Sequence, residues 1–228
     1  MPDFSLVIQE PSDAAAQLIL LCHAAGADAA SLLPLGERLS ETFPKATIVS
    51  LQADTPGASP QGFEWFATTD VADANDVNRA ARVAQAVAAL RTAVRDWQER
   101  SGVPAAATAL IGVSQGAEMV LEASKLQPML ASRVVAMGGR FTTLPDVPPA
   151  VTTIHFLHGK LDALVPYSHS VIAAHHLRDM GCDITAEVVP FVGHELHPDL
   201  IELAITKLST HIAHHLWTAA QEAAPPST

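Results

Sequence analysis

The sequence predicts an α/β fold in which helices cover both faces of a mostly parallel sheet. Short apolar runs alternate along the chain with longer segments that carry apolar residues at helical spacing. Strands that are apolar along their whole length are buried on both faces, as is typical of parallel sheets. The chain has 228 residues, a length that suits one α/β domain with a full hydrophobic core. We therefore expect a single domain over residues 1–228, with an Ala/Pro-rich frayed tail at residues 219–228.

The expected strands are short segments rich in apolar residues, at 18–22, 47–51, 108–113, 133–137, 153–157 and 184–189. The segments between them predict helices at 32–43, 78–100, 115–127, 168–180 and from Pro198 onward. Helix 78–100 has the clearest pattern, because Val83, Val87 and Leu90 begin an apolar stripe along one face. A long loop, 52–75, follows the second strand, and loops of this length in a compact domain are usually functional.

The composition excludes several classes of protein. Lys and Arg number 13 against 24 Asp and Glu, which gives a formal net charge of −11, whereas nucleic-acid binding needs clustered basic side chains. The apolar runs are far shorter than the roughly 20 residues of a membrane-spanning helix, so we expect no stable membrane insertion. Met1–Glu10 has no basic region followed by an apolar stretch, so we expect no signal peptide there. Cys22 and Cys182 lie in no metal-like spacing, and reduced thiols in a cytoplasmic protein are the simplest interpretation.

A serine stands at the most informative turn of the chain. Residues 112–116 read Gly-Val-Ser-Gln-Gly, entered by an apolar run and followed by a helical segment. This G-x-S-x-G pattern is typical of a nucleophile elbow, a strained turn that exposes a serine oxygen above the sheet. Gly112 and Gly116 suit such a turn, because strand and helix approach each other closely there. The alternative is an ordinary Ser/Gly turn at the start of a helix.

A serine nucleophile needs a base, and the base needs an orienting acid. In sheets of this type the acid and then the histidine follow the serine, each after a later strand. Asp162 lies just past the run 153–157, and His194 lies just past the run 184–189. Alone, Asp162 would be interpreted as a turn or N-cap residue, and His194 is one of 11 histidines. Three suitable residue types at three strand ends, in the required order, favour a triad of Ser114, His194 and Asp162.

With these residues in place, the chain resembles the α/β-hydrolase fold without a cap domain. More narrowly, it resembles the phospholipase/carboxylesterase family, which includes acyl-protein-thioesterase-like enzymes and the YpfH-type bacterial esterases. The resemblance spans roughly residues 5–216 and rests on His23–Gly26, Trp65–Phe66, ALIGVSQGAEM at 109–119, HGKLDALVP at 158–166 and Gly193–His194. The related dienelactone hydrolases use a cysteine nucleophile, whereas this chain has a serine.

The resemblance implies an oxyanion hole made of two backbone N–H groups. One belongs to Gln115, the residue after the serine, and the family pattern places the other at Ala25. Family members usually have His-Gly where this chain has His23–Ala24. If position 24 needed a positive φ, Ala24 would be strained.

Other candidate residues have two interpretations each. Trp65 and Phe66 lie in the long loop, where the resemblance implies contact with the substrate, although a hydrophobic plug that pins the loop is an equal alternative. His211 and His215 are four residues apart, a spacing that could hold a metal, but a solvated helix face explains them better. Only residues 138–152 separate two expected strands where many α/β-hydrolases insert a cap, so we expect no cap domain and an open site.

The sequence therefore predicts a cytoplasmic serine carboxylesterase that acts on short- to medium-chain acyl esters. We expect a small-molecule acyl ester as substrate and no metal or organic cofactor. An open apolar rim could support a homodimer. One alternative is an acyl-protein thioesterase or lysophospholipase that uses the same triad. Another is a non-catalytic binding protein on the same fold, because a fold alone does not determine a function.

Overall fold

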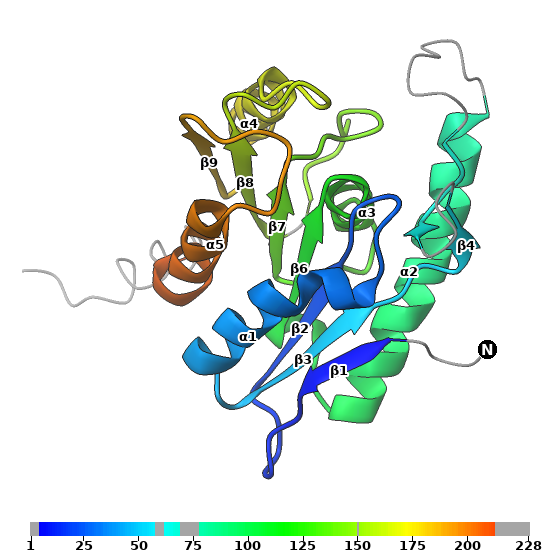
Figure 1. The fold of residues 1–228 in the computed structure, drawn as a ribbon, viewed down its shortest axis with the longest axis vertical. Coiled ribbons are helices and arrows are strands. Elements are labelled where there is room, and N and C mark those ends of the chain that lie inside the picture. Colours follow the sequence, from blue (N-terminus) through cyan, green and yellow to red (C-terminus); the bar gives the residue numbers. More distant parts are fainter. Residues whose placement is uncertain (1–4, 58–61, 69–77, 150, 213–228) are drawn as a thin grey trace, which may run out of the picture.

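The central element of the molecule is a seven-stranded sheet with the strand order β1-β3-β2-β6-β7-β8-β9 (Figure 1). The computed structural model describes residues 5–57, 62–68, 78–149 and 151–212. Strand β1 pairs antiparallel with β3, and all other neighbours in this sheet are parallel. The strands of the sheet are β1 (Leu6–Gln9), β2 (Gln17–Cys22), β3 (Ala46–Leu51), β6 (Thr108–Val113), β7 (Arg133–Met137), β8 (Thr153–Gly159) and β9 (Ile184–Val189).

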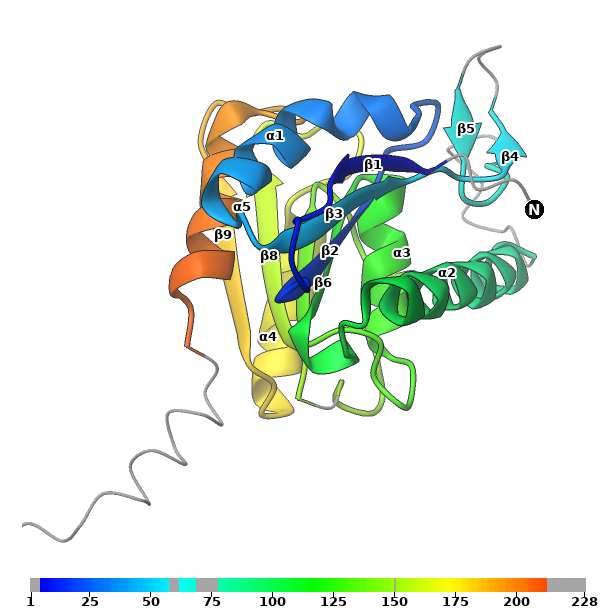
Figure 2. The same cartoon turned by 90° about the horizontal axis from the view of Figure 1, so that it is seen from below.

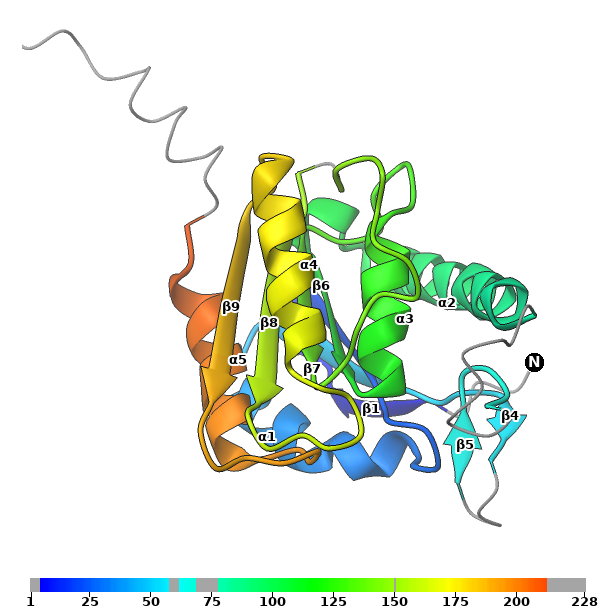
Figure 3. The same ribbon diagram turned by 90° about the horizontal axis from the view of Figure 1, so that it is seen from above.

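Helices cover the sheet on both sides. These are α1 (Leu33–Thr42), α2 (Arg79–Ser101), α3 (Gln115–Ser124), α4 (Ser168–Asp179) and α5 (Pro198–Thr210), with short 3₁₀ turns at Ala29–Leu32 and Ala105–Ala107. One core cluster contains the buried side chains of α2, α3 and α4, and a second contains those of α1 and α5. Figure 3 shows α3 and α4 in front of the sheet and α5 behind it. None of the described helices is long and apolar enough to cross a membrane.

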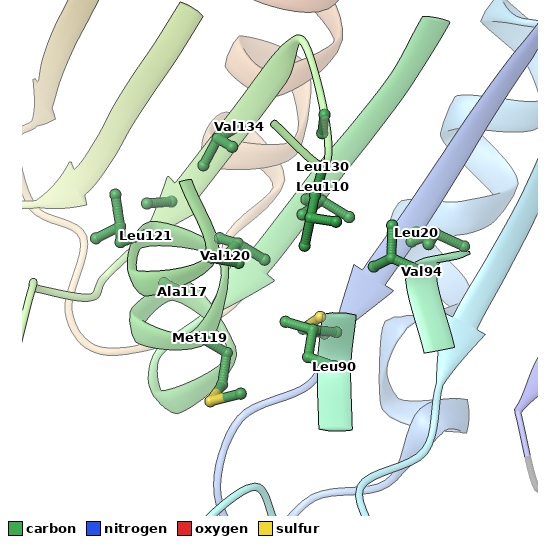
Figure 4. Close-up of a cluster of buried hydrophobic side chains, with 14 of the residues drawn as sticks. Leu20, Leu90, Val94, Leu110, Ala117, Met119, Val120, Leu121, Leu130 and Val134 are labelled. Carbon is green, nitrogen blue, oxygen red and sulfur yellow. The ribbon is translucent and has the colours of Figure 1, made fainter. Parts of the chain in front are cut away.

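The larger core lies between the sheet and helices α2, α3 and α4. Leu90 and Val94 of α2 pack in the same cluster as Leu20 of β2 and Leu110 of β6 (Figure 4). Met119 of α3 is also fully buried there. Because β6 carries side chains into both clusters, it is buried on both faces, as its uninterrupted apolar run requires.

The six expected strands and five expected helices are all present, with ends that differ by a few residues. Two features were missed. Strand β1 is only four residues long and half-buried, so it carries too short a pattern to be recognised. The loop 52–75 contains a small hairpin of β4 (Thr55–Pro56) and β5 (Phe63–Glu64), which stands beside the main sheet (Figure 2). Residues 58–61 and 69–75 of that loop and the expected tail at 219–228 lie outside the described residues.

The fold brings the carboxyl ends of β2, β6, β7, β8 and β9 to one edge of the sheet. Between β7 and β8, residues 138–149 and 151–152 form no helix or strand, in agreement with the expected lack of a cap domain. The segments that follow β6, β8 and β9 contain Ser114, Asp162 and His194. In such sheets, ligands bind at this edge.

Candidate active site

Ser114 occupies a strained turn between β6 and α3. Its backbone has φ 54° and ψ −113°, in the region that side-chain-bearing residues rarely adopt. The flanking glycines explain how the turn fits. A Cβ on Gly116 would lie 2.1 Å from the carbonyl oxygen of Cys22, and one on Gly112 would lie 2.1 Å from the carbonyl oxygen of Gly116. The turn is therefore wedged directly against the end of β2.

Hydrogen bonds connect Ser114 to His194 and His194 to Asp162. The Ser114 Oγ lies 2.8 Å from His194 Nε2, and His194 Nδ1 lies 2.7 Å from Asp162 Oδ2. The Asp162 side chain is fully buried, and that of His194 is 19% exposed. A carboxylate accepts only, so Nδ1 carries the proton and Nε2 is left to accept from the serine hydroxyl. This tautomer is the one that a base acting on Ser114 needs.

Asp162 is held from several sides. Its Oδ1 accepts from the backbone N–H groups of Leu164 and Val165 at 3.0 and 2.8 Å. Burial by itself would raise the pKa of Asp162, but the hydrogen bonds from His194 and from the Val165 N–H outweigh it and bring the pKa below its ordinary value. The carboxylate is consequently charged across the physiological range of pH.

His158, at the end of β8, also contacts this carboxylate. It is fully buried, and its Nε2 lies 3.1 Å from Asp162 Oδ2. Burial lowers the pKa of His158. In the sequence, His158 belongs to the HGKLDALVP motif and has no expected role of its own. A histidine directly after a buried strand and four residues before the acid was the signal available for finding it.

The loop after β2 lies next to the serine turn, because Cys22 of β2 pairs with Gly112 of β6. The positive φ of this loop is at Gly26, with φ 75°, and not at Ala24. The alanine that replaces the usual glycine is therefore not strained. His23 supports the loop, since its Nε2 accepts from the Ala53 N–H at 3.2 Å and its Nδ1 donates to the Ala24 carbonyl at 2.8 Å. The assignment of the oxyanion donors to Ala25 and Gln115 stays a prediction.

Gln115 holds Trp65 and Phe66 through its side chain. Its Oε1 accepts from the Trp65 N–H at 2.7 Å, and its Nε2 donates to the Phe66 carbonyl at 2.9 Å. The Phe66 side chain is 4% exposed and belongs to the larger core. The Trp65 indole N–H donates to the carbonyl of His23 at 2.9 Å. The two aromatic residues thus brace the loop beside the site, and their contact with substrate stays a prediction.

A small apolar cavity opens beside Ser114 and His194, with a volume of about 160 Å³. Most of its wall is aliphatic, and Glu195 contributes the one ionisable side chain besides His194 among the described residues that line it. Its aliphatic lining residues are Ala24, Ala27, Leu32, Val113, Met137, Leu196 and Leu200. Trp65 and Phe66 line a different and larger hollow beside α2.

The candidate metal pair of the sequence falls partly outside the described residues, because His215 is not among them. His211 instead lies 3.1 Å from a carboxylate oxygen of Asp183 and packs edge-on against His155. Within the described part of the chain, no group of three or more His, Cys, Asp and Glu side chains is arranged to hold a metal ion.

Comparison with known proteins identifies the family. The family model described as phospholipase/carboxylesterase matches residues 4–212. The chain is 38% identical over 220 residues to the esterase YpfH of Escherichia coli (strain K12), covering 96% of this chain and 94% of that protein. The crystal structure of esterase PE8 superposes with a TM-score of 0.80 at 28% identity, covering 90% of this chain and 96% of that one. A carboxylesterase from Mesorhizobium loti has the same fold, with a TM-score of 0.73 at 19% identity over 86% of this chain and 90% of its own. The chain therefore belongs to the phospholipase/carboxylesterase family and is an esterase of the α/β-hydrolase superfamily.

Proposed function

We propose that the protein is a serine carboxylesterase that hydrolyses short-chain acyl esters of small molecules through a Ser114–His194–Asp162 triad. The observation that carries the proposal is the unbroken line of hydrogen bonds, 2.8 Å from Ser114 Oγ to His194 Nε2 and 2.7 Å from His194 Nδ1 to Asp162 Oδ2. A serine hydroxyl is a weak nucleophile at its ordinary pKa, and this arrangement removes its proton as it attacks.

The reaction then runs in two halves. Ser114 Oγ attacks the ester carbonyl while His194 Nε2 takes the hydroxyl proton, and Asp162 stabilises the imidazolium that forms. His194 returns the proton to the leaving alcohol, which departs and leaves an acyl-enzyme. A water molecule, deprotonated by His194, attacks the acyl-enzyme and releases the acid. The backbone N–H groups of Gln115 and Ala25 are proposed to stabilise the oxyanion of both tetrahedral intermediates, and loss of one such donor costs about 100- to 1000-fold in rate.

The cavity beside the triad supports a short acyl group. Its volume is about 160 Å³, and a cavity of about 150 Å³ accommodates a benzene molecule. We therefore expect acyl groups of up to about six carbon atoms to fit, on the same scale. Its mostly aliphatic wall favours a hydrocarbon chain over a polar group.

The test combines labelling with a fluorophosphonate probe and hydrolysis of p-nitrophenyl esters from acetate to palmitate. The wild-type protein is expected to label and to turn over, with kcat/KM falling beyond the hexanoate ester. Ser114→Ala should do neither. Ser124→Ala is a matched control, because Ser124 lies on α3 as well and its buried hydroxyl donates to the Leu121 carbonyl.

Each other outcome selects a different conclusion. A folded wild-type protein that neither labels nor hydrolyses any ester would favour the non-catalytic binding protein. A kcat/KM that rises steadily to palmitate would favour the thioesterase or lysophospholipase alternative. Retained turnover in a pure, folded Ser114→Ala protein would refute the assignment of the nucleophile.

A further inference from the structure

We propose that His158 is a positioning residue that donates a hydrogen bond to Asp162 and thereby limits how strongly this carboxylate holds His194. The hydrogen-bonded chain of the site then extends beyond the triad to His158 and Ser170. This inference rests on the proposed function, because it concerns the pH dependence of the triad.

The surroundings of His158 determine its tautomer. Its Nε2 lies 2.8 Å from the Val165 carbonyl oxygen and 3.1 Å from Asp162 Oδ2. Both oxygens can only accept, so Nε2 must carry a proton. Nδ1 lies 2.8 Å from the Ser170 hydroxyl, which is free to donate to it. His158 is fully buried and Ser170 is 2% exposed, so water does not replace these partners. A neutral ring fits these contacts, with its one N–H shared between the Val165 carbonyl and Asp162 Oδ2. Burial, which lowers the pKa of His158, favours that neutral form.

His158 and His194 share one oxygen atom. Both approach Asp162 Oδ2, at 3.1 and 2.7 Å, while the two backbone N–H groups occupy Oδ1. An N–H that donates to Oδ2 withdraws negative charge from the atom that stabilises the His194 imidazolium. Removing this donor leaves more charge on Oδ2 for His194. The imidazolium then persists to higher pH, so the rising limb of kcat/KM against pH should move upward.

The other charged groups near the pair remain the same in every variant compared below. Asp162 lies between the two rings, and Glu195 adjoins His194 at the cavity. His169 of α4 interacts electrostatically with His158 and with Arg140 from the segment after β7. Because none of these residues is altered, a shift of the pH midpoint between variants reports on the donor to Oδ2.

The experiment measures kcat and KM for p-nitrophenyl butyrate from pH 5 to 9, corrected for active sites titrated with the fluorophosphonate. His158→Phe keeps a ring of similar size and has no N–H. We expect its pH midpoint to rise by roughly half a unit or more and its kcat to fall about tenfold. KM should change less than twofold, because His158 is not among the described residues that line the cavity. His158→Gln places an N–H near the Nε2 position and should bring the midpoint back toward the wild-type value.

A second histidine of β8 provides a matched control. His155 is equally buried, and its Nδ1 likewise contacts a hydroxyl, that of Thr185 at 2.9 Å. Residues three apart in a strand point to opposite faces of the sheet. His155→Phe therefore removes a buried histidine from the same strand and should leave the midpoint unchanged.

The outcomes separate this inference from the function on which it rests. No hydrolysis by the wild-type protein contradicts the proposed function itself. Active wild-type protein with the same midpoint in His158→Phe overturns the role of His158 alone, and so does an equal shift in His155→Phe. If His158→Phe does not fold, Ser170→Ala decides the question. That variant removes the hydroxyl that orients His158, so a smaller upward shift supports the inference and an unmoved midpoint overturns it.

Discussion

Replacing Gly116 by alanine should damage both the fold and the activity, because the serine turn has no room for a methyl group. The added Cβ would lie 2.1 Å from the Cys22 carbonyl oxygen and 2.7 Å from that of His23. Observed Cβ contacts essentially never fall below 3.0 Å, so α3 and the end of β2 must separate by about 0.9 Å. These neighbours are backbone atoms of the last residue of β2 and of the residue after it, and backbone atoms cannot turn aside as a flexible side chain can.

The magnitudes follow from this displacement. Overpacking in a tight interior costs about 1–3 kcal/mol of the free energy of unfolding, which for a chain of this size lowers Tm by roughly 2–12 °C. The same shift moves Ser114, two residues before Gly116, relative to His194 and the proposed oxyanion donors. A misplacement of about 1 Å costs about 100-fold in rate, so we expect a loss of that order in kcat/KM.

The assays are thermal unfolding and p-nitrophenyl butyrate hydrolysis per titrated active site. Gly102→Ala is the control, because Gly102 has a positive φ of 69° and no atom within 4 Å of an added Cβ. It lies after α2, before the amino end of β6 and therefore at the opposite end of the sheet from Ser114. The Gly102→Ala protein should have a free energy of unfolding lower by about 1–2 kcal/mol, through backbone strain alone, and should keep its activity. A Gly116→Ala protein with wild-type Tm and wild-type kcat/KM would refute the argument that the turn is wedged against β2.

Three further predictions concern other residues of the fold. Burial, with nearby basic groups, lowers the pKa of His155 to about 3. Below about pH 6.5, His155 is protonated in the unfolded chain but stays neutral in the folded chain. Stability therefore falls as the pH drops from 6.5 toward 3. At pH 5 this difference lowers the free energy of unfolding by about 2 kcal/mol. Urea titrations at pH 7 and pH 5 should show that the free energy of unfolding falls less in His155→Phe than in the wild-type protein. An equal fall in both proteins would contradict the assignment of this pH dependence to His155. Gln115→Ala keeps its backbone N–H but releases the Trp65 and Phe66 backbone. We expect the free energy of unfolding, measured by urea denaturation, to fall by about 1–3 kcal/mol. Unchanged stability would show that this clamp, the two hydrogen bonds from the Gln115 side chain, is unimportant. Asp162→Asn should lower kcat about 10⁴-fold through the wrong imidazole tautomer, and a loss below tenfold in ester hydrolysis would count against its role.

Local patterns in the sequence determined most of the elements and the turn that carries the serine. A parallel strand that is buried on both faces is largely apolar, and runs rich in apolar residues marked six strands of the sheet, of which the edge strand β9 is only partly buried. The elbow was recognisable because a strand, two glycines and a helix lie within 20 consecutive residues, 108–127. Asp162 and His194 were found from their order and from their positions after later strands. Each of these signals depends on neighbours in the chain, which a single sequence displays directly.

Tertiary structure decided which side chains meet. Ser114 and His194 are 80 residues apart, and Asp162 and His194 are 32 apart, so only the ordering of β6, β8 and β9 in one sheet brings them within 3 Å. The partners of His158, the clamp made by the Gln115 side chain and the burial of Phe66 are contacts of the same kind. The sequence left Ala24 open as a strained position, and the structure places the positive φ at Gly26. The size of the cavity beside Ser114 also depends on packing, because its walls come from loops and helices that are distant in sequence and meet only when the chain folds.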